Sequence, residues 1–409
     1  MALPRPILTA SLLGCALIGG YAAVGAMDSN GLGEAIFAHV VNPPHEGYPG
    51  APKPLLREFT GVKLVDDVLA ILVGFFSALL DGDVAPSYRL FGFWAAAQFG
   101  ACWTLVALEG LRAGNRGRLI SWTGTMGLIF QTCSWTITTP LWLILHLFTS
   151  PIAKISSFTS TVSPSVLLVD LWDLAVLPLT VSLTYITPAL PMLLPAQFGA
   201  FAHYAATALW QPFPLWHSIV QFTLSHIARF VDRTQGSPSA AASASPAAYL
   251  VQVKSVYSFV TLLSVVTQVT ILQLVLAPAV VRKSLAVTYP SLAAYADPSV
   301  TFASVFVPHG PLSSPAVDPA ALGSGDLAPL AVHFLQYDMY FGCGAMLLWA
   351  LYLHRNAVAE AKASAAQVAA KVAWWFALGG FAGALSTLLW ERDSVVEDEG
   401  AGKAEKKTQ

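Results

Sequence analysis

The sequence has few charged residues for its length, and this shortage excludes most soluble folds. Only 11% of its 409 residues are Asp, Glu, Lys or Arg, whereas 55% are hydrophobic; soluble domains carry about 25% charged residues. The net charge is −2. No basic stripe with interleaved aromatic residues occurs, so we expect no nucleic-acid partner. The composition predicts an integral membrane protein embedded in a lipid bilayer.

Cysteine is also scarce, and its spacing excludes disulfide frameworks and thiolate metal sites. Cys15, Cys102, Cys133 and Cys343 stand singly in apolar stretches, without a pair at metal-ligand or redox spacing. We interpret all four as small hydrophobic residues in the lipid phase.

Several motifs of lipid-modifying enzymes are missing. The sequence contains no DDxxD, no paired NDxxDxxxD and no DxDD, although Asp66-Asp67 and Asp81-Gly82-Asp83 are fragments of such patterns. It contains no HxxxH or HxxHH box, which disfavours desaturase chemistry, and no GxSxG nucleophile elbow. The sequence therefore predicts neither a metal nor a cofactor.

Long apolar runs are abundant. A membrane span needs about 20 mostly apolar residues. Nine windows qualify, namely 7–26, 64–80, 90–111, 119–148, 168–190, 198–230, 256–281, 332–353 and 372–390. The predicted fold is all-α, a polytopic bundle of about eight or nine transmembrane helices. Residues 7–26 also fit a secretory signal, with Arg5 before the run and small residues at Val24-Gly25-Ala26.

We expect one transmembrane domain over residues 1–390. A low-complexity loop at 232–248 and a long loop at 283–330 interrupt it, and a disordered charged tail at 391–409 follows it.

The positions of the prolines within the apolar windows predict irregular spans. The fourth window should bend at Pro140, and the fifth is crowded by Pro178, Pro188 and Pro191. Pro212, with Pro214, should break the sixth. Such breaks are tolerated where they line a cavity, so we expect a polar pocket near the fifth and sixth windows.

Ionisable residues inside spans are costly and are functional candidates by default. Glu109 lies near the end of the third window and Asp338 near the start of the eighth. With nine spans both fall on one membrane face, together with Asp66 and Asp67, so Glu109 and Asp338 should approach each other. The alternative for Glu109 is a helix-end ion pair with Arg112 at i+3. For Asp66 and Asp67 it is a first helical turn, where acids suit the dipole.

Two further features of the sequence are candidates for a catalytic role, a pair of aspartates and the aromatic residues of the apolar windows. Asp170 and Asp173 form a DxxD pair on one helix face, which alone is a weak metal signal. A desolvated carboxyl can stay protonated and donate its proton at pH 7, and aromatic faces attract cations. The aromatic candidates are Trp94, Trp103, Trp122, Trp135, Trp142, Trp172, Trp349 and Tyr340.

Several of these stretches resemble fungal membrane-bound terpene cyclases of the ascofuranone/ascochlorin type. The similar stretches are Asp81-Gly82, residues 91–98 with Trp103, the run from Glu109 through Arg112 to Asn115, and residues 334–340 with the later Trp374-Trp375 helix. The agreement covers about half of the chain, chiefly residues 60–150 and 330–390.

The resemblance implies an acid-initiated, metal-independent cyclisation of the isomerase or lyase type. A carboxyl group protonates a terminal epoxide or alkene of a prenylated substrate, such as a farnesyl-aromatic compound, without loss of diphosphate. Glu109 and Asp338 would be the proton donor and its partner, in either order. Arg112 and Asn115 would orient Glu109 or contact the substrate head. The other residues expected to contact substrate are Trp103, Asp66, Asp67, Asp170, Asp173, His333, Tyr337 and Tyr340.

The resemblance also implies a setting, the meroterpenoid branch of fungal secondary metabolism. We expect the endoplasmic reticulum membrane, with a prenyltransferase and an epoxidase acting upstream. Two alternatives remain open. A proton-coupled transporter predicts access from two sides and repeat symmetry. A non-enzymatic lipid or sterol binder predicts acids paired with Arg or Lys across helices.

Overall fold

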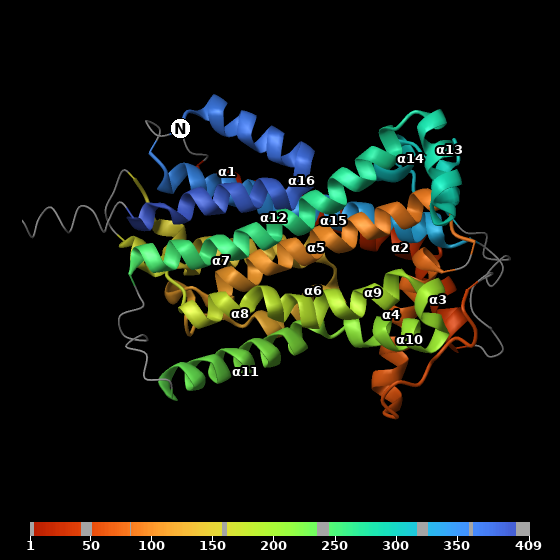
Figure 1. Cartoon of the computed structure of the whole chain (residues 1–409), viewed down its shortest axis with the longest axis horizontal. Coiled ribbons are helices and arrows are strands. Elements are labelled where there is room, and N and C mark those ends of the chain that lie inside the picture. The colour runs from red at the N-terminus through yellow and green to blue at the C-terminus, as the bar shows by residue number, and fades with distance from the viewer. Residues whose placement is uncertain are drawn as a thin grey trace, which may run out of the picture.

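The computed structural model describes residues 4–41, 51–81, 83–157, 162–234, 245–316, 326–359 and 363–397, without the side chains of 39–41. Every regular element in these ranges is a helix, and Figure 1 shows most of the long ones following one axis. The main helices are α1 (Arg5–Gly20), α2 (Ala26–Ser29), α3 (Leu32–Val41), α4 (Lys63–Leu80), α5 (Pro86–Leu111), α6 (Thr123–Cys133), α7 (Trp135–Thr149), α8 (Leu171–Val181), α9 (Thr187–Leu193), α10 (Pro195–Trp210), α11 (Phe213–Thr234), α12 (Pro246–Leu276), α13 (Ala279–Thr288), α14 (Phe302–Phe306), α15 (Ala328–Ala357) and α16 (Ala365–Asp393).

The all-α prediction is confirmed for the described residues. Five helical stretches are long and apolar enough to cross a membrane: Arg5–Ser29, Pro86–Leu111, Pro164–Leu193, Pro246–Leu276 and Ala365–Glu397. The number of eight or nine spans stays a prediction.

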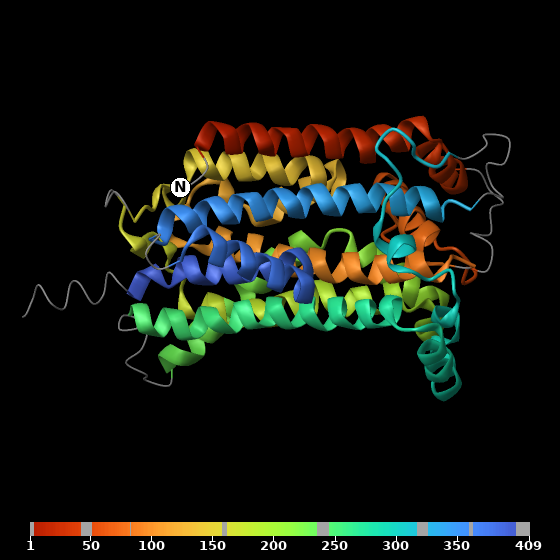
Figure 2. The same cartoon turned by 90° about the horizontal axis from the view of Figure 1, so that it is seen from above.

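Helix α5 is the central element, and α4, α8, α12, α15 and α16 all pack against it. Helix α1 packs against α7 and α15 with Leu8 and Leu12 buried, so the first apolar run is part of the bundle (Figure 2). Close packing around α5 depends on Gly100, where a Cβ atom would lie 2.5 Å from the ring of Tyr185.

The fourth predicted span is a helical hairpin that enters and leaves at the same end of the bundle. α6 and α7 are 11 and 15 residues long, or about 16 and 22 Å, too short for a bilayer core of about 30 Å. The guanidinium of Arg118, before α6, donates a 2.9 Å hydrogen bond to the carbonyl of Thr149, where α7 ends. The chain reverses at Ser134, whose φ is 72°. Pro140, where a bend was predicted, lies inside α7, six residues after this reversal.

A second hairpin replaces the ninth predicted span. α16 is interrupted at Gly379 and Gly380, and Lys371 before the break forms an ion pair with Glu391 after it. In a straight helix these two residues would be about 30 Å apart. Gln98 of α5 fixes the turn, donating to the Gly379 carbonyl and accepting from Ala382 N–H, at 3.1 and 3.0 Å.

The predicted break at Pro212 is confirmed, since α10 ends at Trp210 and α11 begins at Phe213. Pro178 lies within α8. The predicted long loop at 283–330 contains helical elements. It contains the end of α13, a 3-10 helix at Pro290–Ala296 and α14. Residues 317–325 of this loop and 235–244 of the low-complexity loop lie outside the described residues.

The predicted tail boundary at residue 391 is wrong. α16 continues to Asp393, and both Arg392 and Asp393 are buried because they join the ion-pair network described below. Residues 398–409 lie outside the described part of the chain.

Candidate functional site

An apolar cavity of about 440 Å³ lies inside the bundle, a size typical of small-molecule sites. Parts of α4, α5, α10 and α15 and the tip of the α6–α7 hairpin form its wall. We call it the aromatic cavity, because the lining includes Phe75, Phe76, Phe99, Phe130, Trp135, Tyr185, Trp210 and Phe334. Trp210 and Gln211 place the Pro212 break beside this cavity, but the cavity is apolar, whereas the broken spans predicted a polar pocket.

Asp338 is the carboxylic acid among the residues that line the aromatic cavity. Its Oδ1 atom accepts hydrogen bonds from Ser134 Oγ at 2.5 Å and from the Thr136 backbone N–H at 2.9 Å. No ion pair joins it to a basic residue within the described ranges. Both hydrogen bonds reach the same oxygen, so Oδ2 is the oxygen on which this acid can carry a proton.

The hairpin tip explains how the sequence positions this acid. Ser134 takes a left-handed conformation that reverses the chain, and the next residues begin α7. The N-terminus of α7 therefore points its free N–H groups at Asp338. Trp135 forms the adjacent wall and packs against Gly342, one helical turn beyond Asp338 on α15. The acid and the indole thus meet on one face of α15.

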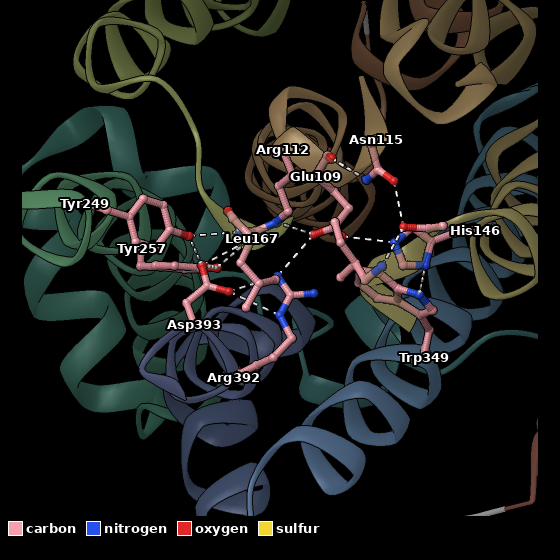
Figure 3. A network of polar contacts seen from close by, with 12 residues as sticks. Glu109, Arg112, Asn115, His146, Leu167, Tyr249, Tyr257, Trp349, Arg392 and Asp393 are labelled. Carbon is pink, nitrogen blue, oxygen red and sulfur yellow. Dashed lines mark hydrogen bonds and ion pairs between the residues drawn. The ribbon is translucent and has the colours of Figure 1, made fainter. Parts of the chain in front are cut away.

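Glu109 lies in a different environment, a buried ion-pair network at the end of α5 (Figure 3). Its Oε2 atom accepts from Arg112 Nε at 2.7 Å and from Arg392 at 3.1 Å. Asp393 completes the network, with contacts of 2.9 Å to Arg112 and 3.0 Å to Arg392. Two guanidinium groups face two carboxylates, so the charges cancel.

His146 shows that Glu109 is an acceptor at both oxygens. Trp349 Nε1 can only donate, and it donates to His146 Nδ1 at 3.1 Å. The hydrogen of a neutral His146 ring is therefore on Nε2, which donates to Glu109 Oε1 at 3.0 Å. With donors at both oxygens, Glu109 is held as a carboxylate and has no proton to give.

The predicted approach of Glu109 to Asp338 is wrong. Helices α5 and α15 run parallel, with Cys102 Sγ and Cys343 Sγ 3.7 Å apart. Glu109 is seven residues after Cys102, and Asp338 is five residues before Cys343. At 1.5 Å per residue the two acids are separated by about 18 Å along the bundle. The prediction counted residues 119–148 as one membrane crossing. Because this window is a hairpin that returns to the same side, each later helix begins on the opposite side, relative to Glu109, from the one predicted.

The residues predicted beside Glu109 belong to the network or to its surroundings. Arg112 is buried and also contacts the Leu167 carbonyl at 2.8 Å. Asn115 donates to the Glu109 carbonyl and accepts from Ser150 Oγ, at 2.8 and 2.6 Å. Trp103 is fully buried outside the aromatic cavity, with its ring 5.0 Å from that of Phe213.

The four predicted aspartates all have local partners. Asp66 accepts hydrogen bonds from the backbone N–H groups of residues 59–61. Asp67 is 54% exposed and pairs with Lys63 at 2.8 Å. Asp170 caps the N-terminus of α8, and both Asp170 and Asp173 pair with Arg229. None of the four lines the aromatic cavity.

The three predicted substrate contacts near Asp338 on α15, namely His333, Tyr337 and Tyr340, do not line the aromatic cavity. Tyr337 OH donates to the His309 carbonyl at 2.8 Å, and Tyr340 OH to the Phe306 carbonyl at 2.6 Å. His333 is buried beside Tyr337, with ring centroids 5.0 Å apart. The two tyrosines secure the segment around α14 against α15.

Sequence reasoning missed Ser134, Arg392 and Asp393 as members of these two sites. No local pattern marks Ser134, because its importance arises from a turn that brings it to Asp338. Arg392 and Asp393 lie among charged residues whose composition predicts a disordered tail. No group of three or more His, Cys, Asp or Glu residues with metal-site geometry occurs among the described residues.

The fold and the cavity define a class, a helical protein with a buried acid in an aromatic-lined chamber and several helices long enough for a bilayer. The chain belongs to the CtvD domain family, which matches residues 8–397. This confirms the resemblance to fungal terpene cyclases.

Two relatives are similar over most of their length. Terpene cyclase ascI of Acremonium egyptiacum is 25% identical over 362 residues, covering 85% of this chain and 83% of the relative. Terpene cyclase ctvD of Aspergillus terreus is 24% identical over 347 residues, covering 84% of this chain and 87% of the relative. No solved structure matches the chain.

Proposed function

We propose that this protein is an integral membrane terpene cyclase in which Asp338 protonates the terminal epoxide or alkene of a prenylated substrate. The observation that carries the proposal is the position of Asp338, an unpaired carboxyl in an aromatic cavity. Membership of the CtvD family and the names of both relatives support the cyclase class.

The hydrogen bonds around Asp338 suit a proton donor. The Oδ2–H group gives its proton to the epoxide oxygen or to the terminal alkene carbon. Ser134 and the Thr136 N–H already donate to Oδ1, so they stabilise the carboxylate that remains after transfer. They are in place before the reaction, which avoids a reorganisation cost during it.

The bond changes balance without a co-reactant. When an epoxide is protonated, its C–O bond breaks and leaves a hydroxyl and a carbocation. An internal alkene attacks the cation, forms a C–C bond and moves the positive charge along the chain. Loss of a proton, or capture by an internal hydroxyl followed by proton loss, ends the sequence. One proton enters and one leaves, so the product is an isomer of the substrate.

Aromatic rings line the path that a carbocation would take. Trp135 packs edge to face on Phe99 and Phe130, with ring centroids 4.9 and 5.2 Å away. Tyr185 packs on Trp210 at 5.3 Å. Such faces attract a cation and do not react with it. The wall therefore holds the intermediate and keeps water from capturing it.

The two alternatives fit the acids less well. Glu109 is paired with arginines across helices, as the lipid-binder alternative predicts, but Asp338 is not. A transporter needs two-sided access, whereas the aromatic cavity contains one acid and lies at one level of the bundle. We propose the endoplasmic reticulum membrane as the site of action. A prenyltransferase and an epoxidase would make the substrate.

The test is turnover by membranes from cells that express the full chain. These membranes receive an epoxidised farnesyl phenol, and the products are separated by liquid chromatography with mass detection. We expect a new product of unchanged mass and shifted retention, absent with membranes from empty-vector cells. No isomer from a panel of epoxidised and unmodified prenyl phenols would contradict the proposed function.

A further inference from the structure

A second cavity, of about 560 Å³, lies between α6, α8 and α11 on the side of the bundle away from Asp338. We call it the side cavity. It shares no lining residue with the aromatic cavity. Trp103 and Phe213, with ring centroids 5.0 Å apart, lie in the packed region between the two. Contact there is tight, because a Cβ atom on Gly127 would lie 2.5 Å from the Trp103 ring.

The lining of the side cavity is more polar than that of the aromatic cavity, and one face of α11 supplies much of it. His217, Gln221, Ser225 and Arg229 follow each other at intervals of four residues, so they form one row along the helix. The opposite face carries Ile219, which is 49% exposed and suits lipid. A polar row turned away from lipid requires partners inside the protein or from a ligand.

Two buried members of this row have a polar atom without a hydrogen-bond partner in the described part of the chain. His217 is 2% exposed and makes no hydrogen bond with a described residue, and its Nδ1 atom is enclosed. Gln221 Nε2 donates to the Asp173 carbonyl at 2.9 Å, which leaves its Oε1 atom buried without a donor. Unsatisfied polar groups of this kind are rare in folded proteins, and a hydroxyl group bound in the side cavity can pair with the His217 nitrogen that is not enclosed.

The charges around the side cavity select against an anion. Arg229 lies 3.1 Å from Asp170 and 2.8 Å from Asp173, so two carboxylates surround one guanidinium. His226 Nδ1 lies 2.7 Å from the Phe222 carbonyl and donates to it, which leaves Nε2 of a neutral ring as an acceptor. The described lining of the cavity therefore offers no free positive charge, and the neutral rings of His217 and His226 favour a neutral ligand with a hydroxyl group.

The mouth of the cavity suits an amphipathic molecule. Trp122, 54% exposed, and Phe222, 65% exposed, lie among the lining residues. Leu128 and Leu215 provide an apolar surface farther along the cavity. A molecule bound here can place hydroxyl groups on the α11 row while its apolar part follows the leucines.

We propose that the side cavity binds the hydroxylated head of a neutral amphipathic molecule, a lipid-soluble phenol or a sterol. His217 and Gln221 supply its hydrogen bonds, and this site is separate from the cavity of Asp338. The proposal does not depend on the cyclase function, because it concerns other residues and a binding equilibrium.

The test uses the full chain in phosphatidylcholine nanodiscs and a photoreactive 4-dodecylresorcinol, whose saturated chain cannot be cyclised. Cross-linked peptides are identified by mass spectrometry. We expect saturable labelling of residues 121–128 and 215–229. Unlabelled dodecylresorcinol should compete, and its dimethyl ether, which has no O–H donor, should not. A parallel competition with ergosterol shows whether the site prefers a phenol or a sterol. The preferred class is the one whose member suppresses labelling more strongly at equal concentration.

The main variant is His217→Phe, which keeps the ring and removes both nitrogens. Losing one hydrogen bond should weaken binding about two- to tenfold. Ile219→Phe, on the lipid face of the same helix, is the matched control and should bind normally. The melting temperature in nanodiscs, compared with that of the parent protein, reports whether the variant is folded. Leu128→Phe, which narrows the side cavity without changing a polar group, is measured in parallel and should also weaken binding.

Two results would overturn the proposal. One is labelling of α6 and α11 that the dimethyl ether suppresses as well as the phenol does. The other is unchanged binding in both His217→Phe and Leu128→Phe. Neither result bears on the turnover assay, so failure of this site and failure of the cyclase function are distinguishable.

Discussion

Asp338→Asn isolates proton donation from every other property of the site. The amide oxygen can accept the hydrogen bonds that Asp338 Oδ1 now receives from Ser134 and Thr136 N–H. The amide nitrogen takes the place of Oδ2 with nearly the same volume, so the cavity keeps its shape. An amide, however, cannot release a proton to an epoxide or an alkene. The variant should fold and bind substrate but fail at the first chemical step.

The expected loss is large. General acid catalysis by a positioned side chain contributes about 10²- to 10⁴-fold to rate, which corresponds to about 3 to 5 kcal/mol of activation free energy. The loss should appear in kcat, while KM stays close to that of the parent protein, because the aromatic wall that binds the prenyl chain is unchanged. Thermal stability should change little, since Asp338 has no ion pair to lose.

The assay is product formation from an epoxidised farnesyl phenol by purified protein in nanodiscs, followed over time at several substrate concentrations. Asp67→Asn is the matched control, because it makes the same change at an exposed acid outside the cavity. It should retain full activity. If Asp338→Asn keeps the parent rate with an unchanged melting temperature, Asp338 is not the proton donor and the mechanism proposed here is refuted.

Three further variants test the surrounding structure. Ser134→Ala removes one of two donors to the conjugate base and should lower kcat roughly 10- to 100-fold with KM retained; an unchanged kcat would show that the hydrogen bond plays no part in the reaction. Glu109→Gln leaves two buried guanidinium groups facing one carboxylate and should destabilise the fold by about 3 to 5 kcal/mol in thermal unfolding; full stability with abolished turnover would instead favour a catalytic role. Gly342→Ala would place a Cβ atom 2.1 Å from the Trp135 ring and push the indole toward the cavity, so the ratio of cyclised products should change. Gly344→Ala is its control, because the nearest side-chain atom there is 4.0 Å away. An equal change in product ratio for both variants would contradict the placement of Trp135 in the cavity wall.

The two helical hairpins show why hydropathy alone misjudged the topology. The window 119–148 has 30 residues, which suffices for one bent helix or for two short antiparallel ones. Composition measures the length of an apolar run and carries no information about its direction. The reversal depends on the backbone of Ser134 and on Asp338, a partner 204 residues away that accepts its hydroxyl hydrogen bond. The break at Gly379 and Gly380 depends in the same way on Gln98.

For Glu109 and Asp338 as well, some features could be predicted from the sequence and others could not. The rarity of charge in the apolar windows was enough to select Glu109 and Asp338, because a carboxyl in a span is too costly to be accidental. The sequence also provided the pairing of Glu109 with Arg112 at i+3 as an alternative, and the structure contains that ion pair. It did not provide Arg392, 283 residues away, whose guanidinium helps hold Glu109 as a carboxylate.

By itself, then, the sequence determined the helical class, the similarity to terpene cyclases and the two acids of interest, since each follows from composition or from local motifs. Only the tertiary structure decided which acid faces an aromatic cavity and which is neutralised. The physical reason is that the behaviour of a buried carboxyl depends on the groups within a few ångströms of it. For Asp338 these are a serine and a helix N-terminus, and for Glu109 they are two arginines and a histidine.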